Sequence, residues 1–312
     1  MSGPLVTVVM AVYNREPWVA RAIESVLAQT YRAFELVVVD DGSTDGTRGV
    51  LQRYASRATL LSCAHLGAYR ARSMALRCAR GELVAFIDSD DLWYPDRLSS
   101  QVPLFERPEL GLAFGDAALV DHRVAPPRRL TRTFFDTTPP FRGRGGGGFT
   151  RGNFVPFSSV LVRRECFERC GEFAPVMRGA DYLKWFEIAQ RYEVDYVARP
   201  IFEYAIHQDS LSHPMLNVLP ARIEVFGQAL RTTRDPAVRV QMQQIIFNQR
   251  WHLAIARARS CSGAALRPFA GGESDLREVP LGRRVRWGLT FIRIQLASRA
   301  RRALIAAGLA RR

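Results

Sequence analysis

The 312-residue chain contains a single lysine, Lys184, so arginine supplies nearly all of its 44 basic side chains. Cysteine is also sparse. The five thiols are odd in number and show no CxxC spacing, which argues against both a disulfide framework and a zinc site. This use of cysteine fits a protein of the reducing cytoplasm, which is the location we expect.

Long apolar runs and a P-loop are also missing. No uninterrupted apolar stretch reaches the ~18 residues of a membrane-spanning helix. The apolar stretch near the start has no basic leader and is interrupted at Asn14-Arg15-Glu16, so we expect a strand there and no signal peptide. The glycine-rich run at residues 142–148 lacks the GxxxxGK[ST] spacing and predicts a flexible active-site loop, neither helix nor strand.

Positive charge is concentrated near the C-terminus. The net charge is +14, and residues 220–312 hold 18 arginines against 5 acidic residues. This basic C-terminal segment suits an anionic lipid surface, nucleic acid or an acidic partner. Coding bias explains arginine in place of lysine, but it does not explain the local imbalance. The segment lacks a known nucleic-acid-binding motif and regularly spaced stacking aromatics, so no nucleic acid is expected as a partner.

Residues 285–312 mix arginines with large apolar side chains. Two interpretations stay open. A basic amphipathic helix on an anionic membrane surface would place the protein peripherally at the inner face of the plasma membrane. A terminal helix packed on its own domain is the alternative.

Strands and helices alternate in the first hundred residues. Apolar runs at residues 6–10 and 34–39 predict buried parallel strands, and helical spacing of apolar side chains predicts a helix over 17–29. A second helix at 67–79 precedes a strand at 83–87. The alternation predicts an α/β fold with a doubly wound, mainly parallel sheet, whose ligand crevice lies outside the carboxyl ends of the strands.

The pattern is weaker beyond residue 100. Strands are expected at 112–114 and 158–162, and a helix at 182–192. From about residue 216 the sequence is mainly helical. We therefore expect two domains, residues 1–215 and the basic, helical extension 216–312.

Carboxylates stand where two of these strands should end. Asp40 and Asp41 follow one strand, and Asp88, Asp90 and Asp91 follow another. Like charges this close repel one another unless a cation lies between them, and hard oxygen ligands favour Mg2+ or Mn2+. A solvated acidic turn that caps the next helix is the alternative.

Four blocks of sequence resemble the family 2 glycosyltransferases of GT-A fold. They are VTVVMAVYN at 6–14, SVLAQTY at 25–31, ELVVVDDGSTD at 35–45 and GELVAFIDSDD at 81–91. The resemblance is strong to about residue 100, patchy to about 215 and negligible beyond. It implies a metal-dependent hexosyltransferase that inverts the anomeric configuration of a nucleotide-sugar, in the synthesis of cell-envelope polysaccharide or glycolipid.

The resemblance also implies a donor site. The residues that it assigns to the nucleotide-sugar are Ala11, Tyr13, Asp41, Arg72 and Asp88. The Tyr13 ring would stack on the base, and the Asp41 carboxylate would accept the imide N–H of uracil or thymine, which favours UDP or dTDP. Arg72 would lie near the diphosphate. Asp90 would bind Mg2+ or Mn2+, with Asp88 on the ribose or on the metal through water and His207 as a further metal ligand.

The same resemblance makes Asp181 the general base that deprotonates a glycan or lipid-linked acceptor. The family commonly has a glutamate before this aspartate, whereas this chain has Ala180. Taken alone, Asp181 would be a helix N-cap, and Asp91 a helix cap or a support for its neighbours. Ser158 and Ser159 fall on the acceptor side with open roles. A non-catalytic GT-A-like module that binds nucleotide or glycan is the alternative function, and Ala180 is its main support.

Overall fold

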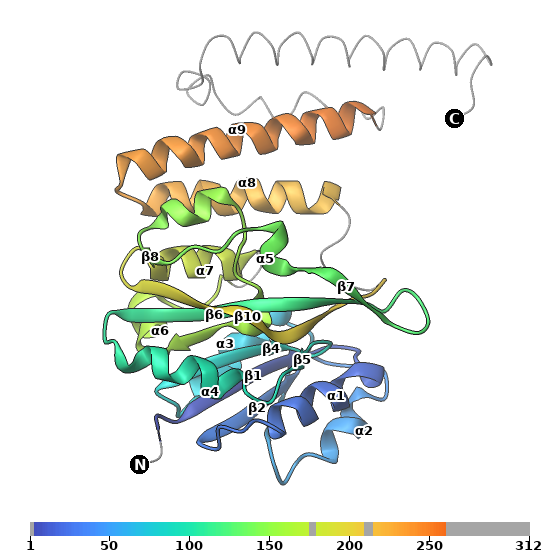
Figure 1. Ribbon diagram of the computed structural model, residues 1–312. Coiled ribbons are helices and arrows are strands. Elements are labelled where there is room, and N and C mark those ends of the chain that lie inside the picture. The colour runs from blue at the N-terminus through green and yellow to red at the C-terminus, as the bar shows by residue number, and fades with distance from the viewer. Residues whose placement is uncertain (1–2, 175–178, 209–214, 260–312) are drawn as a thin grey trace, which may run out of the picture. The chain divides into compact units, whose positions relative to one another are not determined.

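The computed structural model describes residues 3–174, 179–208 and 215–259 (Figure 1). The chain divides into two compact units, Met1–Ser210 and Leu211–Arg312. In the second unit, helices α8 (Met215–Thr232) and α9 (Pro236–Arg259) pack against each other. The amphipathic helix considered for residues 285–312 lies outside the described residues. Among the described helices, none combines the length and apolar character that a membrane crossing requires.

The first unit is built on one mixed sheet. Its strands are β1 (Val6–Val12), β2 (Phe34–Asp40), β3 (Thr59–Ser62), β4 (Leu83–Asp88), β5 (Leu92–Trp93), β6 (Leu110–Asp121), β7 (Arg128–Thr133), β8 (Gly143–Arg144), β9 (Leu161–Arg163) and β10 (Glu193–Ile206). The strand order is β3-β2-β1-β4-β9-β6-β10-β5, with β7 on β6 and β8 on β10. Strands β1, β2, β3 and β4 pair in parallel, and so do β6 and β10, whereas β9 runs antiparallel to β4 and β6.

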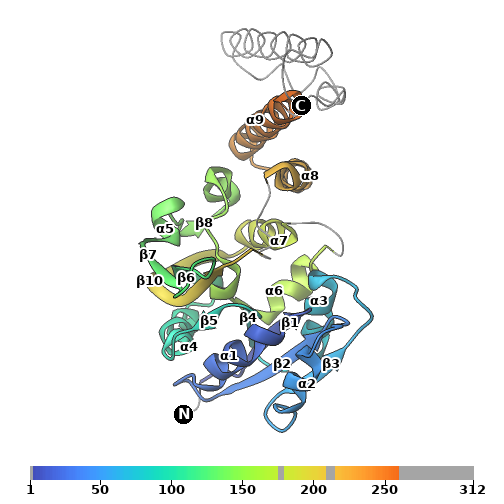
Figure 2. The same ribbon diagram turned by 90° about the vertical axis from the view of Figure 1, so that its right-hand side faces the viewer.

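Helices cover both faces of the parallel half of this sheet. Those of the first unit are α1 (Glu16–Leu27), α2 (Thr47–Gln52), α3 (Ala68–Cys78), α4 (Arg97–Gln101), α5 (Phe134–Thr137), α6 (Arg164–Cys170) and α7 (Ala180–Ala189). Three 3-10 helices join them: η1 (Val102–Glu106), η2 (Gly146–Arg151) and η3 (Phe157–Ser159). Helices α1 and α4 lie on one face, and α3 and α6 lie on the other (Figure 2). This is the doubly wound arrangement that the sequence predicts.

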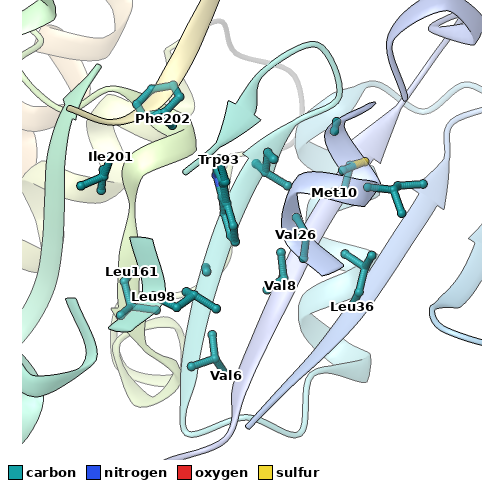
Figure 3. Close-up of a cluster of buried hydrophobic side chains, with 14 of the residues drawn as sticks. Val6, Val8, Met10, Val26, Leu36, Trp93, Leu98, Leu161, Ile201 and Phe202 are labelled. Carbon is teal, nitrogen blue, oxygen red and sulfur yellow. The ribbon is translucent and has the colours of Figure 1, made fainter. Parts of the chain in front are cut away.

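The core explains why these segments fold as they do. Strand β1 is buried on both faces, as its unbroken β-branched and apolar sequence requires. Helix α1 begins with a proline in its first turn and turns Val26 toward Val8 and Met10 of the strand (Figure 3). Trp93 and Leu98 extend this cluster toward β10. Full burial of such a side chain contributes about 1.5–3 kcal/mol to stability.

Three expectations for the middle of the chain need correction. Strand β6 is much longer than the expected 112–114 and is buried along its whole length. The expected strand at 158–162 is instead the 3-10 helix η3 followed by β9. The glycine run is not irregular, since it forms β8 and η2. A Cβ on Gly146 would collide with the Phe186 ring and one on Gly148 with the Phe141 ring, so glycine allows a close backbone approach there.

Candidate functional site

Parallel pairing gathers the predicted strand-end residues at one edge of the sheet. Ala11 of β1 pairs with Asp88 of β4 on one side and with Val39 of β2 on the other. Val12 pairs with Asp40, so the carboxylates that follow β2 and β4 flank the end of β1. Acidic side chains therefore stand at the carboxyl ends of these strands, where the sequence predicts a ligand crevice.

Tyr13 and Asp41 form one end of this edge. Tyr13 is 38% exposed, and its ring centroid lies 4.0 Å from that of His65. The Asp41 carboxylate is buried and accepts hydrogen bonds from the backbone N–H groups of Leu66, at 2.6 Å, and Gly67, at 3.0 Å. Asp41 thus fixes the loop before α3 and holds His65 beside the exposed tyrosine. Sequence reasoning missed His65.

Asp88 is held by Arg72 of helix α3. The Arg72 Nη2 atom donates a 2.5 Å hydrogen bond to Asp88 Oδ1, and about a third of the Asp88 side chain stays exposed. Arg72 also lies over the Phe157 ring, 4.0 Å from its centroid. Burial raises the pKa of Asp88 to about 6; Asp90 and Asp181 add to the rise, and Arg72 opposes it. Asp88 is therefore a carboxylate that a nearby positive charge would stabilise.

Asp90 faces two basic side chains. His207 Nε2 lies 2.9 Å from Asp90 Oδ2, and Arg15 Nε lies 3.4 Å from the same oxygen. The Trp18 ring stacks on His207 at 4.9 Å between centroids and fixes the plane of the imidazole. Burial acts to raise the pKa of Asp90, but the hydrogen bond from His207 and the charge of Arg15 outweigh it and lower the pKa. The structure thus unites two residues that the resemblance assigned to the metal.

Asp91 connects the acidic loop after β4 to two other segments of the fold. Its side chain is buried, accepts a 2.5 Å hydrogen bond from Ser158 Oγ and accepts another, at 3.0 Å, from the Ala205 backbone N–H. Ser158 in turn accepts a hydrogen bond from the Asp88 backbone N–H. Asp91 is not a helix cap, because α4 begins later, after Asp96. It ties η3 and β10 to the acidic loop.

Asp181 comes from a distant segment, in the first turn of α7. The capping position is Gly179, so the N-cap alternative for Asp181 is wrong. The Tyr69 hydroxyl, from α3, donates a 2.7 Å hydrogen bond to Asp181 Oδ1. The positive end of the α7 dipole also favours a negative charge at this position. Because Tyr69 and Arg72 lie one turn apart on α3, this helix links Asp181 to Asp88.

The residues around Asp90 suit a divalent cation that is shared with a phosphate ligand. Within the described residues, no three His, Cys, Asp or Glu side chains form a complete metal cluster. Mg2+, however, is commonly bound by one or two carboxylates while substrate phosphates and water complete its coordination. Asp90, with Asp88 and His207 beside it, supplies donors of this kind.

Comparison with known proteins identifies the family. The model of the family described as Glycosyl transferase family 2 matches residues 7–171, more than half of the chain. The protein is a family 2 glycosyltransferase. Among its curated relatives, WfgD of Escherichia coli, a UDP-Glc:alpha-D-GlcNAc-diphosphoundecaprenol beta-1,3-glucosyltransferase, is 29% identical over 240 residues. That alignment spans 73% of this glycosyltransferase and 87% of WfgD.

Solved structures establish the GT-A fold of this glycosyltransferase. The mannosyltransferase PcManGT from Pyrobaculum calidifontis, in complex with GDP-Man and Mn2+, has a TM-score of 0.64 at 22% identity, covering 96% of this chain and 86% of PcManGT. S. aureus TarS 1–349, in complex with UDP-GlcNAc, has a TM-score of 0.60 at 15% identity, covering 88% of this chain and 78% of TarS. The fold predicted from the sequence is therefore confirmed.

The glycosyltransferase contains neighbours of the predicted residues that sequence reasoning missed. Arg15 and Trp18 follow strand β1; Arg15 contacts Asp90, and Trp18 stacks on His207. Tyr69 stands three residues before Arg72, and this spacing on a helix was the signal that could have placed both on one face. Of the two serines expected on the acceptor side, Ser158 donates a hydrogen bond to Asp91, and Ser159 donates one to the Pro156 carbonyl. Both hydroxyls are used inside the fold.

Proposed function

We propose that this glycosyltransferase moves a hexosyl group from UDP or dTDP to a sugar hydroxyl of a lipid-linked acceptor, with inversion, in cell-envelope glycan synthesis. The observation that carries the proposal is the link through α3. Arg72 holds Asp88 at the end of β4, and Tyr69, one turn earlier, holds Asp181. The charge of Asp181 adds to the rise in the pKa of Asp88, so the carboxylate assigned to the donor and the candidate base lie near each other. The lipid-linked diphosphate acceptor in the name of WfgD supports the acceptor class.

On the donor side, the exposed Tyr13 ring would stack on the base, and Ala11 would lie beneath the nucleotide at the end of β1. Asp41 would accept the imide N–H of the base while it holds the neighbouring loop. Asp90, Asp88 and His207 would hold Mg2+ or Mn2+, which neutralises charge on the leaving diphosphate when bound. Arg72 and Arg15 would add fixed positive charge beside it.

On the acceptor side, Asp181 would accept the proton of the acceptor hydroxyl. That oxygen forms a bond to the anomeric carbon while the bond from this carbon to the diphosphate oxygen breaks. The bonding electrons leave with the nucleoside diphosphate. A single displacement inverts the anomeric centre, so an α-linked donor gives a β-linked product. The beta linkage in the name of WfgD agrees with this outcome.

An acceptor carried by a membrane lipid would bring the protein to the membrane surface. We propose a cytoplasmic protein with peripheral contact at the inner face of the plasma membrane. The net charge of +14, concentrated in residues 220–312, supports attraction to anionic lipid.

A screen of nucleotide-sugar turnover with Mg2+ or Mn2+ tests the proposal. Purified protein should release UDP or dTDP from one donor in the presence of a synthetic lipid-diphosphate-linked sugar. The Asp181→Asn variant should lose this turnover and still bind UDP. A fully active variant would exclude Asp181 as the base. Nucleotide binding without turnover of any donor would instead favour the non-catalytic module that Ala180 suggests.

A further inference from the structure

Tyr69 contacts the candidate base from a helix far away in the sequence. Its hydroxyl donates the 2.7 Å hydrogen bond to Asp181 Oδ1 across 112 positions of the chain. No other described side chain donates a hydrogen bond to this carboxylate. Oδ1 is thereby occupied, and Oδ2 is the oxygen left to meet an acceptor hydroxyl.

The Tyr69 ring has little freedom to turn away. It is partly buried and packs against Phe173, with 5.7 Å between the ring centroids. The Arg72 guanidinium lies over its face, 5.1 Å from the centroid, while it also binds Asp88. The Tyr69 ring is thus held by contacts with two side chains, Phe173 and Arg72.

The hydroxyl also stays protonated. Burial and the charge of Asp181 raise the pKa of Tyr69 well above its ordinary value, although Arg72 opposes the rise. Tyr69 therefore remains a hydrogen-bond donor at neutral pH. A donor suits a neighbour that must stay ionised before it accepts a proton.

The side chain beside Asp181 in the sequence cannot hydrogen-bond to its carboxylate. Ala180 is buried and has no polar atom in its side chain. An aspartate at a helix start can turn about two side-chain torsions, so a separate contact is needed to hold one productive orientation.

We infer that Tyr69 is a positioning residue, which fixes the Asp181 carboxylate so that Oδ2 faces the acceptor. This inference rests on the proposed function, since it assumes that Asp181 is the base. Loss of one hydrogen bond to a charged group should lower the rate of transfer about tenfold. Donor binding should not change, because Tyr69 acts on the acceptor side.

The test compares Tyr69→Phe with a matched control, Tyr31→Phe. Each change removes one phenolic hydroxyl and keeps the ring. The Tyr31 hydroxyl donates a 2.6 Å hydrogen bond to the Pro4 carbonyl, before the start of β1 and at the other end of this strand from Asp88. We would measure kcat for UDP release from the donor that the screen identifies, the dissociation constant of UDP with Mn2+ by calorimetry, and the Tm.

Tyr69→Phe should lower kcat about tenfold with the UDP dissociation constant within twofold of the parent, and Tyr31→Phe should leave both unchanged. A kcat for Tyr69→Phe within twofold of the parent would overturn the inference. So would an equal loss of kcat and of UDP binding, because that result indicates a structural role. Asp181→Asn separates the two claims: if it is fully active the proposed base is wrong, whereas if it is inactive and Tyr69→Phe is not, only this inference fails.

Discussion

Asp88 and Asp90 stand two residues apart but have opposite electrostatic surroundings. Burial raises the pKa of Asp88 to about 6, whereas His207 and Arg15 lower the pKa of Asp90 against the effect of burial. Asp90 is thus ionised over a wider range of pH. This difference favours Asp90 as the main metal ligand of the pair.

The Asp90→Ala variant should weaken metal-dependent binding of UDP. With Mn2+ present, removal of the main carboxylate ligand should raise the UDP dissociation constant roughly 10- to 100-fold. Calorimetric titrations with and without Mn2+ measure the effect. Without metal, parent and variant should bind UDP about equally. If Mn2+ improves UDP binding as much in the variant as in the parent, the metal site is elsewhere.

The raised pKa of Asp88 predicts a pH dependence of stability in the metal-free protein. The pKa of Asp88 rises from 3.8 to about 6 on folding, so the folded state binds this proton more tightly than the unfolded chain does. Protonation of Asp88 therefore stabilises the folded state. This contribution is complete below about pH 4 and is lost as the pH rises through about 6. Asp88→Asn should therefore be less sensitive than the parent to a change from pH 4.5 to pH 7. Urea unfolding at both values measures this, and equal sensitivity in the two proteins would contradict the account.

The sequence predicted the positions of those site residues that lie within its motifs. The blocks around Asp88 and Asp90 placed these carboxylates at a strand end, and parallel pairing confirmed that position beside Ala11. The contact from Tyr69 to Asp181 could not be predicted, because it depends on how α3 and α7 pack. The roles of these residues remain predictions.

At the scale of elements, the structure that a glycine-rich segment adopts depends on the side chains that pack against it. The run at 142–148 was expected to be a flexible loop from composition alone. In the structure it forms β8 and η2, since two aromatic rings occupy the space where side chains would stand. The length of strand β6 was likewise underestimated, because Gly115 and Asp116 interrupt the apolar pattern although the whole strand is buried. Tertiary packing decided both cases.

Gly146→Ala should destabilise the protein by about 1–3 kcal/mol, because its Cβ would overlap the ring of the buried Phe186. Gly49→Ala is the control. Gly49 lies exposed in α2 with nothing near its Cβ position, so alanine should stabilise that helix by about 0.5–1 kcal/mol. Urea unfolding would compare the two variants. A neutral Gly146→Ala would mean that the packing of η2 on Phe186 is loose.

At the scale of the whole molecule, the first unit contains the candidate site residues and the second contains most of the excess positive charge. The GT-A sheet brings the ends of β1, β2 and β4 together, which explains how residues between positions 11 and 91 lie at one edge of the sheet. The alternation of strands and helices predicted this fold, and the comparisons confirm the fold. The membrane contact that we propose for the basic C-terminal segment rests on its charge alone.

The full chain should bind vesicles that contain anionic lipid and not neutral vesicles. The 18 arginines of residues 220–312 against 5 acidic residues provide the attraction. Raising the salt concentration from 0.1 to about 0.5 M should release the protein, because screening shortens the reach of these charges. Co-sedimentation measures the bound fraction. Equal binding to both vesicle types would exclude electrostatic attraction as its cause.

The central claim is that Asp181 is the general base of an inverting transfer from a nucleotide-sugar. It is tested most directly by proton NMR of the reaction with an α-linked UDP-sugar, a lipid-diphosphate-linked acceptor and Mn2+, for the parent and for Asp181→Asn. The account predicts a β-linked product from the parent and none from the variant, although the variant still binds UDP. An α-linked product, or the same product formed at the same rate by Asp181→Asn, would contradict it.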